Sequence, residues 1–301
     1  MRTLVFRGNK NKKNYFEGWY FKFVDDSQDL IIILIPGISI FNEKMAFLQY
    51  IIHFKSEVYQ GFLKYDIHKF EIQEPFRLSF DHGFISKNRV KLDLDVIKAD
   101  LILGAFTPLK TSVWNPSIMG FFEYLNMPCF HDVISMNHSV HGKVNIGGKE
   151  LSFQGKGYIE GDRGKSFPKF YIWAQCNHFK NERTSLFLSV ADISSPFLNF
   201  LGHIAVLHHE GIEYRFASYL GSKAKVQVSP DRQHAHVSFK STKHHLMLDI
   251  DINQGNSLIA PMHNRMDFKI KEQVRSNIRM DFDGYRDESS FCASELVNWK
   301  I

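Results

Sequence analysis

Cysteine is scarce in this sequence of 301 residues, which contains three: Cys129, Cys176 and Cys292. They lie far apart and their number is odd, so they predict no disulfide framework. Their spacing also does not match the paired cysteines of a structural zinc site. The simplest inference is a protein that works in a reducing compartment.

Long apolar runs are also missing. The longest, "LIIILIPGISIF" at Leu30–Phe41, is broken by Pro36 and Gly37. It falls short of the roughly 18 apolar residues expected of a membrane-spanning helix. The opening "MRTLVFRGNKNKK" lacks the apolar run of a signal peptide, so we expect a cytoplasmic protein. The basic cluster "RGNKNKKN" could add peripheral contact with an anionic membrane, although a solvated chain terminus is the simpler interpretation.

No charge of one sign dominates. The chain has 37 Lys and Arg residues against 32 Asp and Glu, and the net charge is +5 with neutral histidine. The basic residues are mostly spread along the chain, which does not favour a nucleic-acid partner. The G-x-S-x-G nucleophile turn, the P-loop and the dinucleotide glycine fingerprint are all absent. Serine hydrolases, P-loop enzymes and dinucleotide-binding enzymes are therefore not predicted.

What the sequence does have is aromatic and strand-like. It contains 28 Phe, 11 Tyr and 4 Trp residues, and 44% of its residues are hydrophobic. Short runs with period-two alternation recur between turn residues, and we expect roughly twenty strands. The predicted fold is all-β with little helix: two consecutive antiparallel barrels or sandwiches of the lipocalin-like kind.

The chain length fits two domains. We place the N-terminal barrel at residues 1–165 and the C-terminal barrel at residues 166–301. The stretch Thr111–Met136 shows no clean alternation and is predicted to be an irregular connection with one short helix near Ser117–Leu125.

Two predicted strand faces bring together side chains that could form a functional site. In "ELSFQGKGYIEGD" the period of two places Tyr158, Glu160 and Asp162 on one side. In "KFYIWAQCNHF" the same period gives a second face of aromatic and amide side chains, an arrangement more typical of a pocket lining than of a dry core. That face consists of Tyr171, Trp173, Gln175 and Asn177. Near the start, Glu17 shares a strand face with Tyr15, Trp19 and Phe21.

These acids allow two interpretations. They could form ordinary ion pairs with Arg163 and Lys165 at a strand end. Alternatively, an acid inside an apolar cavity would stay protonated near neutral pH, and aromatic faces could stabilise a cation formed beside it. A third possibility is a metal held by His234 and His236 on one strand, but scattered surface histidines explain that pair better.

Several segments resemble the tocopherol cyclase family and its bacterial relatives. They are "YFEGWYFK", "NHSVHGKV", "FQGKGYIEGDRGKSFPKFYIWAQCNHF", "GIEYRFASYLGSK", "LIAPMHNRM" and "ASELV", in the family order over nearly the whole chain. The resemblance implies a pair of lipocalin-like barrels, related in architecture to carotenoid hydratases. It also implies closure of a prenylated hydroquinone to a chromanol by alkene protonation, without redox change, cofactor or metal.

From this chemistry we expect Asp162 or Glu160 to be the acid. Tyr158, Trp173 and Trp19 would line the cation site, and a set of polar residues would orient the phenol: Asn137, His138, Gln175 and Asn177. Glu17 and Tyr171 complete the expected contacts with a hydrophobic isoprenoid ligand. Two alternatives stay open: a lipid- or isoprenoid-binding protein without catalysis, and a hydratase that uses the same protonation.

Overall fold

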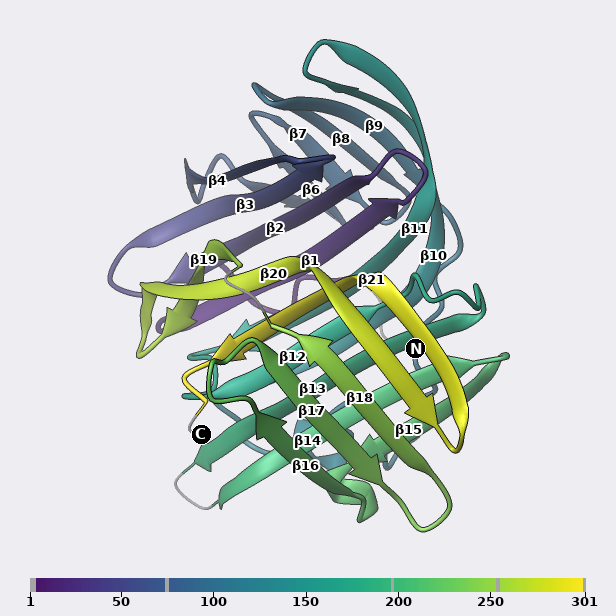
Figure 1. Ribbon diagram of the computed structural model, residues 1–301. Helices are drawn as coiled ribbons and strands as arrows, with labels where there is room; N and C mark the ends of the chain where they lie inside the picture. The colour runs from purple at the N-terminus through teal and green to yellow at the C-terminus, as the bar shows by residue number, and fades with distance from the viewer. Residues whose placement is uncertain (1–3, 74–75, 196–197, 253–254, 300–301) are drawn as a thin grey trace. The chain divides into compact units, whose positions relative to one another are not determined.

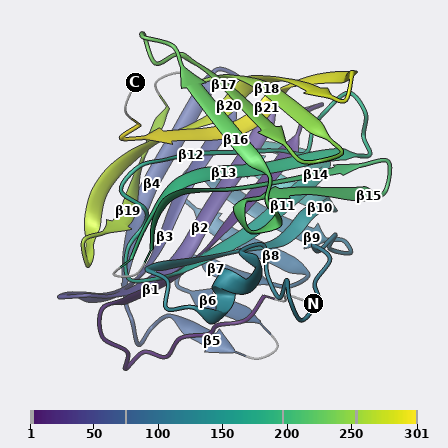
Figure 2. The ribbon, with the colours of Figure 1, turned by 90° about the horizontal axis from the view of Figure 1, so that it is seen from below.

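The computed structural model describes residues 4–73, 76–195, 198–252 and 255–299, and nearly all of the regular structure is β-strand (Figure 1). In the described ranges the helical elements are two short 3-10 turns, η1 at Gly120–Tyr124 and η2 at Ser218–Leu220. Figure 2 shows η1 as a coiled ribbon. None of the described helices has the length and apolar character needed to span a membrane.

The first sheet has eleven strands in the order β4-β3-β2-β1-β11-β10-β9-β8-β7-β6-β5. Its antiparallel neighbours are mostly consecutive in the chain, and β1 pairs with β11 to join the two halves. The strands are β1 (Tyr15–Asp25), β2 (Leu30–Ile40), β3 (Lys44–Phe54), β4 (Glu57–Asp66), β5 (Glu71–Gln73), β6 (Arg77–Phe80), β7 (Gly83–Ser86), β8 (Arg89–Leu94), β9 (Ile97–Leu103), β10 (Cys129–Ile146) and β11 (Lys149–Gly164).

The second sheet has ten strands, nine of them in the order β15-β14-β13-β12-β21-β20-β18-β17-β16, with β19 paired to β20. These strands are β12 (Tyr171–Cys176), β13 (Thr184–Ser195), β14 (Leu198–His209), β15 (Ile212–Ala217), β16 (Lys223–Val228), β17 (His234–Lys240), β18 (His245–Asp251), β19 (Asn256–Met262), β20 (Arg265–Phe282) and β21 (Tyr285–Val297).

Each sheet curls around its own hydrophobic core, as alternating strands require when one face must be removed from water. In the first sheet, Phe21, Phe23 and Ile159 belong to this core and are fully buried. In the second, Ile172, Ala174 and Cys176 supply the core-facing positions of β12. The predicted all-β fold of two lipocalin-like sheets is therefore confirmed.

The described chain forms two compact units. The first comprises Met1–Leu109, Phe130–Ser166 and His263–Met266; the second comprises Lys110–Cys129, Phe167–Met262 and Asp267–Ile301. The sequence-based division between residues 165 and 166 stays a prediction about domains. Relative to that division, Lys110–Cys129 belongs to the second unit, and Ser166 and His263–Met266 belong to the first.

The connection predicted at Thr111–Met136 is shorter than expected, because β10 already begins at Cys129. Residues Asp132–Met136 of that strand are all buried, so neither face is exposed to solvent and the alternation between apolar and polar residues is lost. The short helix predicted near Ser117–Leu125 is present as η1.

Glycines in β11 allow close contacts with neighbouring strands. A Cβ atom at Gly155 would lie 1.9 Å from the carbonyl oxygen of Val24. A Cβ at Gly157 would lie 2.3 Å from Nε2 of His138, whose ring occupies that space. Larger residues at these two positions would therefore push the neighbouring strand or ring away from β11.

Candidate functional site

The ends of β10 and β11 bring together a histidine, two acids and a tyrosine within the first unit. Asp162 Oδ1 lies 2.8 Å from Nδ1 of His131. Glu160 Oε2 lies 3.5 Å from Nε2 of the same ring and accepts a 2.5 Å hydrogen bond from the hydroxyl of Tyr158. We call these four residues the His131 cluster. Tyr158, Glu160 and Asp162 share one side of β11, as predicted.

Burial and charge set the protonation states of this cluster. Burial alone would lower the pKa of His131, but the carboxylates of Asp162 and Glu160 and the hydrogen bond to Asp162 raise it to about 9. His131 is therefore an imidazolium at neutral pH. Burial and the neighbouring Glu160 raise the pKa of Tyr158 well above its ordinary value, so the phenol stays a hydrogen-bond donor.

Glu17 forms a separate buried acid centre near the N-terminal segment. Its carboxylate accepts hydrogen bonds from the hydroxyl of Tyr15 (2.6 Å) and from the backbone N–H groups of Arg7 (2.9 Å) and Gly8 (2.8 Å). Burial raises the pKa of Glu17, although these three hydrogen bonds oppose the shift. The carboxylate thus fastens the N-terminal segment to β1.

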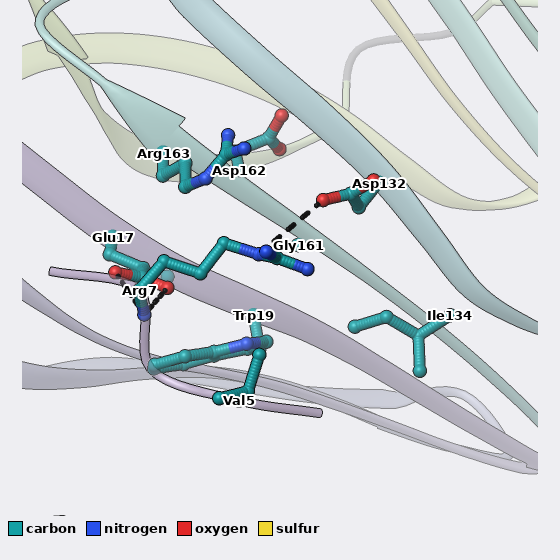
Figure 3. Close-up of a pocket in the computed structure, with 10 residues that line it drawn as sticks. Val5, Arg7, Glu17, Trp19, Asp132, Ile134, Gly161, Asp162 and Arg163 are labelled. Atoms are coloured by element: carbon teal, nitrogen blue, oxygen red, sulfur yellow. Dashed lines mark hydrogen bonds and ion pairs between the residues drawn. The ribbon is translucent and has the colours of Figure 1, made fainter. Parts of the chain in front are cut away.

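A small pocket lies between this segment and the sheet (Figure 3). Its volume is about 20 Å³, room for about one water molecule rather than a substrate. Arg7 crosses it toward Asp132, at 3.9 Å, and Trp19 forms one wall. Gly161 to Arg163 border the pocket from β11.

Glu17 and Trp19 do not face the same way as the two acids of β11. The register pairs Trp19 with Gly161 and Gly18 with Asp162, and directly paired residues share a face. Glu17 and Trp19 therefore point to the core side of the sheet, and Glu160 and Asp162 to the other side.

His138 and Asn137 make contacts outside the His131 cluster. The ring of His138 packs against Phe106 and Phe23 and has Ser135 Oγ 3.0 Å from its Nδ1. Burial lowers the pKa of His138 to about 3, so it is neutral. The carbonyl oxygen of Asn137 accepts hydrogen bonds from Ser135 Oγ and from the backbone N–H of Thr107. These contacts favour a structural role for His138, whereas those of Asn137 involve only its backbone carbonyl.

The remaining predicted residues lie in the second unit, where they share one buried face of β12 and the residues after it: Tyr171, Trp173, Gln175 and Asn177. Tyr171 donates a 2.6 Å hydrogen bond to Glu295, which pairs with Trp173 across the strands. Glu295 also pairs with the fully buried Glu272 on β20. This face therefore holds two acids that sequence reasoning missed.

His131 was missed as well, although a signal was present. The turn at Gly147–Gly148 makes β10 and β11 a hairpin. Counting back from that turn places His131 near the end of β11, within reach of Asp162. The alternation predicts a shared face for β11 alone, and His131 lies in the stretch Thr111–Met136, which is predicted to be irregular.

A metal is the other group that the His131 cluster could hold. Among the described residues, His131, Glu160 and Asp162 each offer one ligand atom, all within 4.8 Å of one another. The short contact between His131 Nδ1 and Asp162, however, is that of an ion pair. The surface histidines His234 and His236 likewise each face an aspartate across the strands, Asp251 and Asp249.

We therefore expect metal removal to have no effect. Incubation with EDTA should shift the melting temperature by less than about 2 °C, because no ligand-linked stabilisation would be lost. Differential scanning fluorimetry before and after dialysis checks this, with zinc and magnesium added back separately. A drop reversed by one of these ions would contradict the ion-pair assignment.

Comparison with known proteins agrees with the fold. None of the curated proteins compared with the chain matches it. A solved structure of a putative AttH from Nitrosomonas europaea is similar, with a TM-score of 0.63 and 12% identity over 100% of this chain and 98% of that one. Kievitone hydratase from Nectria haematococca gives a TM-score of 0.56 and 9% identity over 94% of this chain and 88% of that one.

The amino-acid sequence shows which family the chain belongs to. The tocopherol cyclase-like family matches residues 109–295, more than half of the chain. This range contains all four members of the His131 cluster and the polar face of β12. The resemblance inferred from the segments quoted above is thereby confirmed, and the chain belongs to the tocopherol cyclase-like family.

Proposed function

We propose that this protein is a cofactor-independent enzyme that protonates an isoprenoid alkene and closes a prenylated hydroquinone to a chromanol. The observation that carries the proposal is the His131 cluster, in which Glu160 is 5% exposed and hydrogen-bonded to Tyr158. A carboxyl group withdrawn from water can deliver a proton without losing it to solvent.

Of the two candidate acids, we assign the proton transfer to Glu160. Asp162 lies 2.8 Å from the imidazole of His131 and is engaged in an ion pair with it. Glu160 is 3.5 Å from the ring, a weaker contact. Asp162 is then a positioning residue that holds His131 in place. The imidazolium would in turn stabilise the Glu160 carboxylate left after the proton transfer.

The reaction balances without a redox partner. The acid gives its proton to the less substituted alkene carbon and leaves a tertiary cation. The phenol oxygen forms a bond to that cation, and the phenol loses its proton, which restores the acid. Substrate and product are isomers. Aromatic rings beside the acid would stabilise the cation, and Tyr158 and Tyr20, with ring centroids 6.4 Å apart, are in that position.

The proposed contacts of Trp173, Tyr171, Gln175, Asn177, Glu17, Trp19, Asn137 and His138 with substrate stay predictions. The test of the function itself is turnover of a phytylated hydroquinone, or one with a shorter prenyl chain, under reducing conditions. Chromatography of the product against a chromanol standard gives the answer. Saturable binding without product would favour the alternative of a non-catalytic isoprenoid-binding protein.

A hydratase is the second candidate, because the fold is shared with a protein named as a hydratase. The two reactions differ after the common protonation, since a hydratase adds water where the cyclase adds the phenol oxygen. Turnover in water labelled with oxygen-18 separates them. We expect a product of unchanged mass that contains no labelled oxygen. A product heavier by one labelled water would establish the hydratase.

A further inference from the structure

Apolar side chains gather on the surface of the second unit around residues 113–125. Of the ten large hydrophobic side chains that are more than a third exposed in the described ranges, six lie here or on the neighbouring η2. They are Val113, Trp114, Phe121, Tyr124, Leu125 and Leu220, and we call them the Trp114 surface. Trp114 is 81% exposed, Val113 78% and Tyr124 65%. Such exposure of an indole is unusual for a surface that faces only water.

Specific contacts hold this surface in place. The hydroxyl of Tyr124 donates a 2.9 Å hydrogen bond to the carbonyl oxygen of Val113, which ties the two ends of the segment together. Tyr219 donates one of 2.8 Å to Ile118, and the ring of Phe122 stacks on Phe200 with centroids 5.7 Å apart. The exposed side chains are thus presented by a segment that is fixed to its own unit.

A buried ion pair anchors the start of the segment. Glu213 accepts a hydrogen bond from the backbone N–H of Lys110, and Arg215 donates one to the carbonyl oxygen of Lys110, both at 2.8 Å. Glu213 and Arg215 are themselves 2.6 Å apart. Glu213 and Arg215 neutralise each other and bind the backbone of Lys110. The charge that this surface presents to solvent therefore comes from other residues.

That displayed charge is positive. Over residues 110–127 and 218–225 the exposed charged side chains are Lys110, Lys223 and Lys225. The acid in these ranges, Glu123, is half-buried and accepts a hydrogen bond from Ser117. An aromatic and aliphatic surface bordered by lysines complements a bilayer, where aromatic rings lie at the headgroup level and lysines meet anionic lipid.

We propose that the Trp114 surface docks the protein on a lipid bilayer that contains anionic lipids. Trp114, Val113 and Tyr124 enter the interface, and Lys110 and Lys223 contact the headgroups. This inference goes beyond the proposed function and does not need turnover for its test. A lipid partner is favoured over a protein partner because the segment outside η1 is irregular and offers no strand edge for pairing.

Vesicle binding by the full chain tests the proposal. The vesicles are phosphatidylcholine with about 30 mol% phosphatidylglycerol, and sedimentation gives the bound fraction. We expect V113S/W114S to weaken partitioning at least about tenfold. The control, V58S/I102S, removes two apolar side chains of the first unit that are 43% and 46% exposed, and this variant should bind like the wild type. K110E/K223E should weaken binding, and salt should weaken wild-type binding.

Melting temperatures of all variants show whether they fold. If V113S/W114S does not fold, K110E/K223E still tests the proposal. Failure of the wild type to bind these vesicles would overturn the proposal. So would equal binding by V113S/W114S and the control. A loss of self-association in V113S/W114S by light scattering, without any change in vesicle binding, would assign the surface to a second copy of the chain instead.

Discussion

Replacing Glu160 by glutamine is expected to lower kcat for chromanol formation by about a thousandfold, within the range found when a general acid is removed. Glutamine keeps the size of the side chain and can still accept the hydrogen bond from Tyr158, but it has no proton to donate to an alkene. The matched control is E150Q, which changes an exposed acid on the same strand, β11, and should leave kcat unchanged.

Two accompanying measurements keep this result interpretable. The melting temperature of E160Q should stay close to that of the wild type, and binding of the hydroquinone should remain saturable. D162N should reduce kcat less than E160Q if Asp162 acts through His131 rather than on the substrate. Full activity of E160Q on a stable fold, together with strong loss in D162N, would move the acid assignment to Asp162.

The second large effect is a fall in stability between about pH 6.5 and about pH 9 that is specific to His131. The folded-state pKa of His131 is raised to about 9 from an ordinary 6.5. Its ion pair with Asp162 therefore contributes its full stability below about pH 6.5. That contribution disappears as the pH rises through about 9.

The magnitude follows from the size of the shift. The pKa change corresponds to at most about 3 kcal/mol, and because the His131 side chain is 18% exposed we expect on the order of 1–2 kcal/mol. Urea unfolding of the wild type and of H131N at both ends of this pH range measures it. The wild type should lose this stability on going to high pH, and H131N should not. Parallel pH curves for the two proteins would show that the pKa of His131 is not raised in the folded state.

The fold was predictable wherever one face of a strand is buried and the other is wet. Strands such as β8 and β17 alternate strictly between buried and less buried residues, and the period of two is plain in the sequence. The start of β10 differs because Asp132–Met136 are buried on both faces. No local pattern marks such a segment, and its strand becomes evident only from its pairing partners.

Some residues of the candidate site were likewise predictable from local alternation, and others were not. Tyr158, Glu160 and Asp162 lie on one strand, so their common face followed from alternation alone. His131 and Glu295 come to their partners from other strands, and finding them requires the register between strands. That register shifts at irregular positions, as between Gln273, Ser276 and Ile278 on β20, and the sequence does not mark these shifts.

Glu17 illustrates a different limit of prediction from the sequence. Its strand face with Tyr15 and Trp19 was predicted, but the register places it on the core side of β1, away from the acids of β11. The N-terminal segment that covers it was expected to be a solvated terminus. Instead, the backbone N–H groups of Arg7 and Gly8 donate hydrogen bonds to the Glu17 carboxylate. A contact of this kind depends on how the chain folds back, which composition does not show.

The measurement that tests the central claim most directly is turnover of the prenylated hydroquinone by the wild-type protein in deuterium oxide, with the product analysed by mass spectrometry and NMR. If Glu160 protonates the alkene, the chromanol carries one deuterium on the carbon beside the new quaternary centre and no additional oxygen. E160Q should form this product about a thousandfold more slowly. A chromanol without carbon-bound deuterium, or a hydroquinone that binds and returns unchanged and unlabelled, would contradict the account.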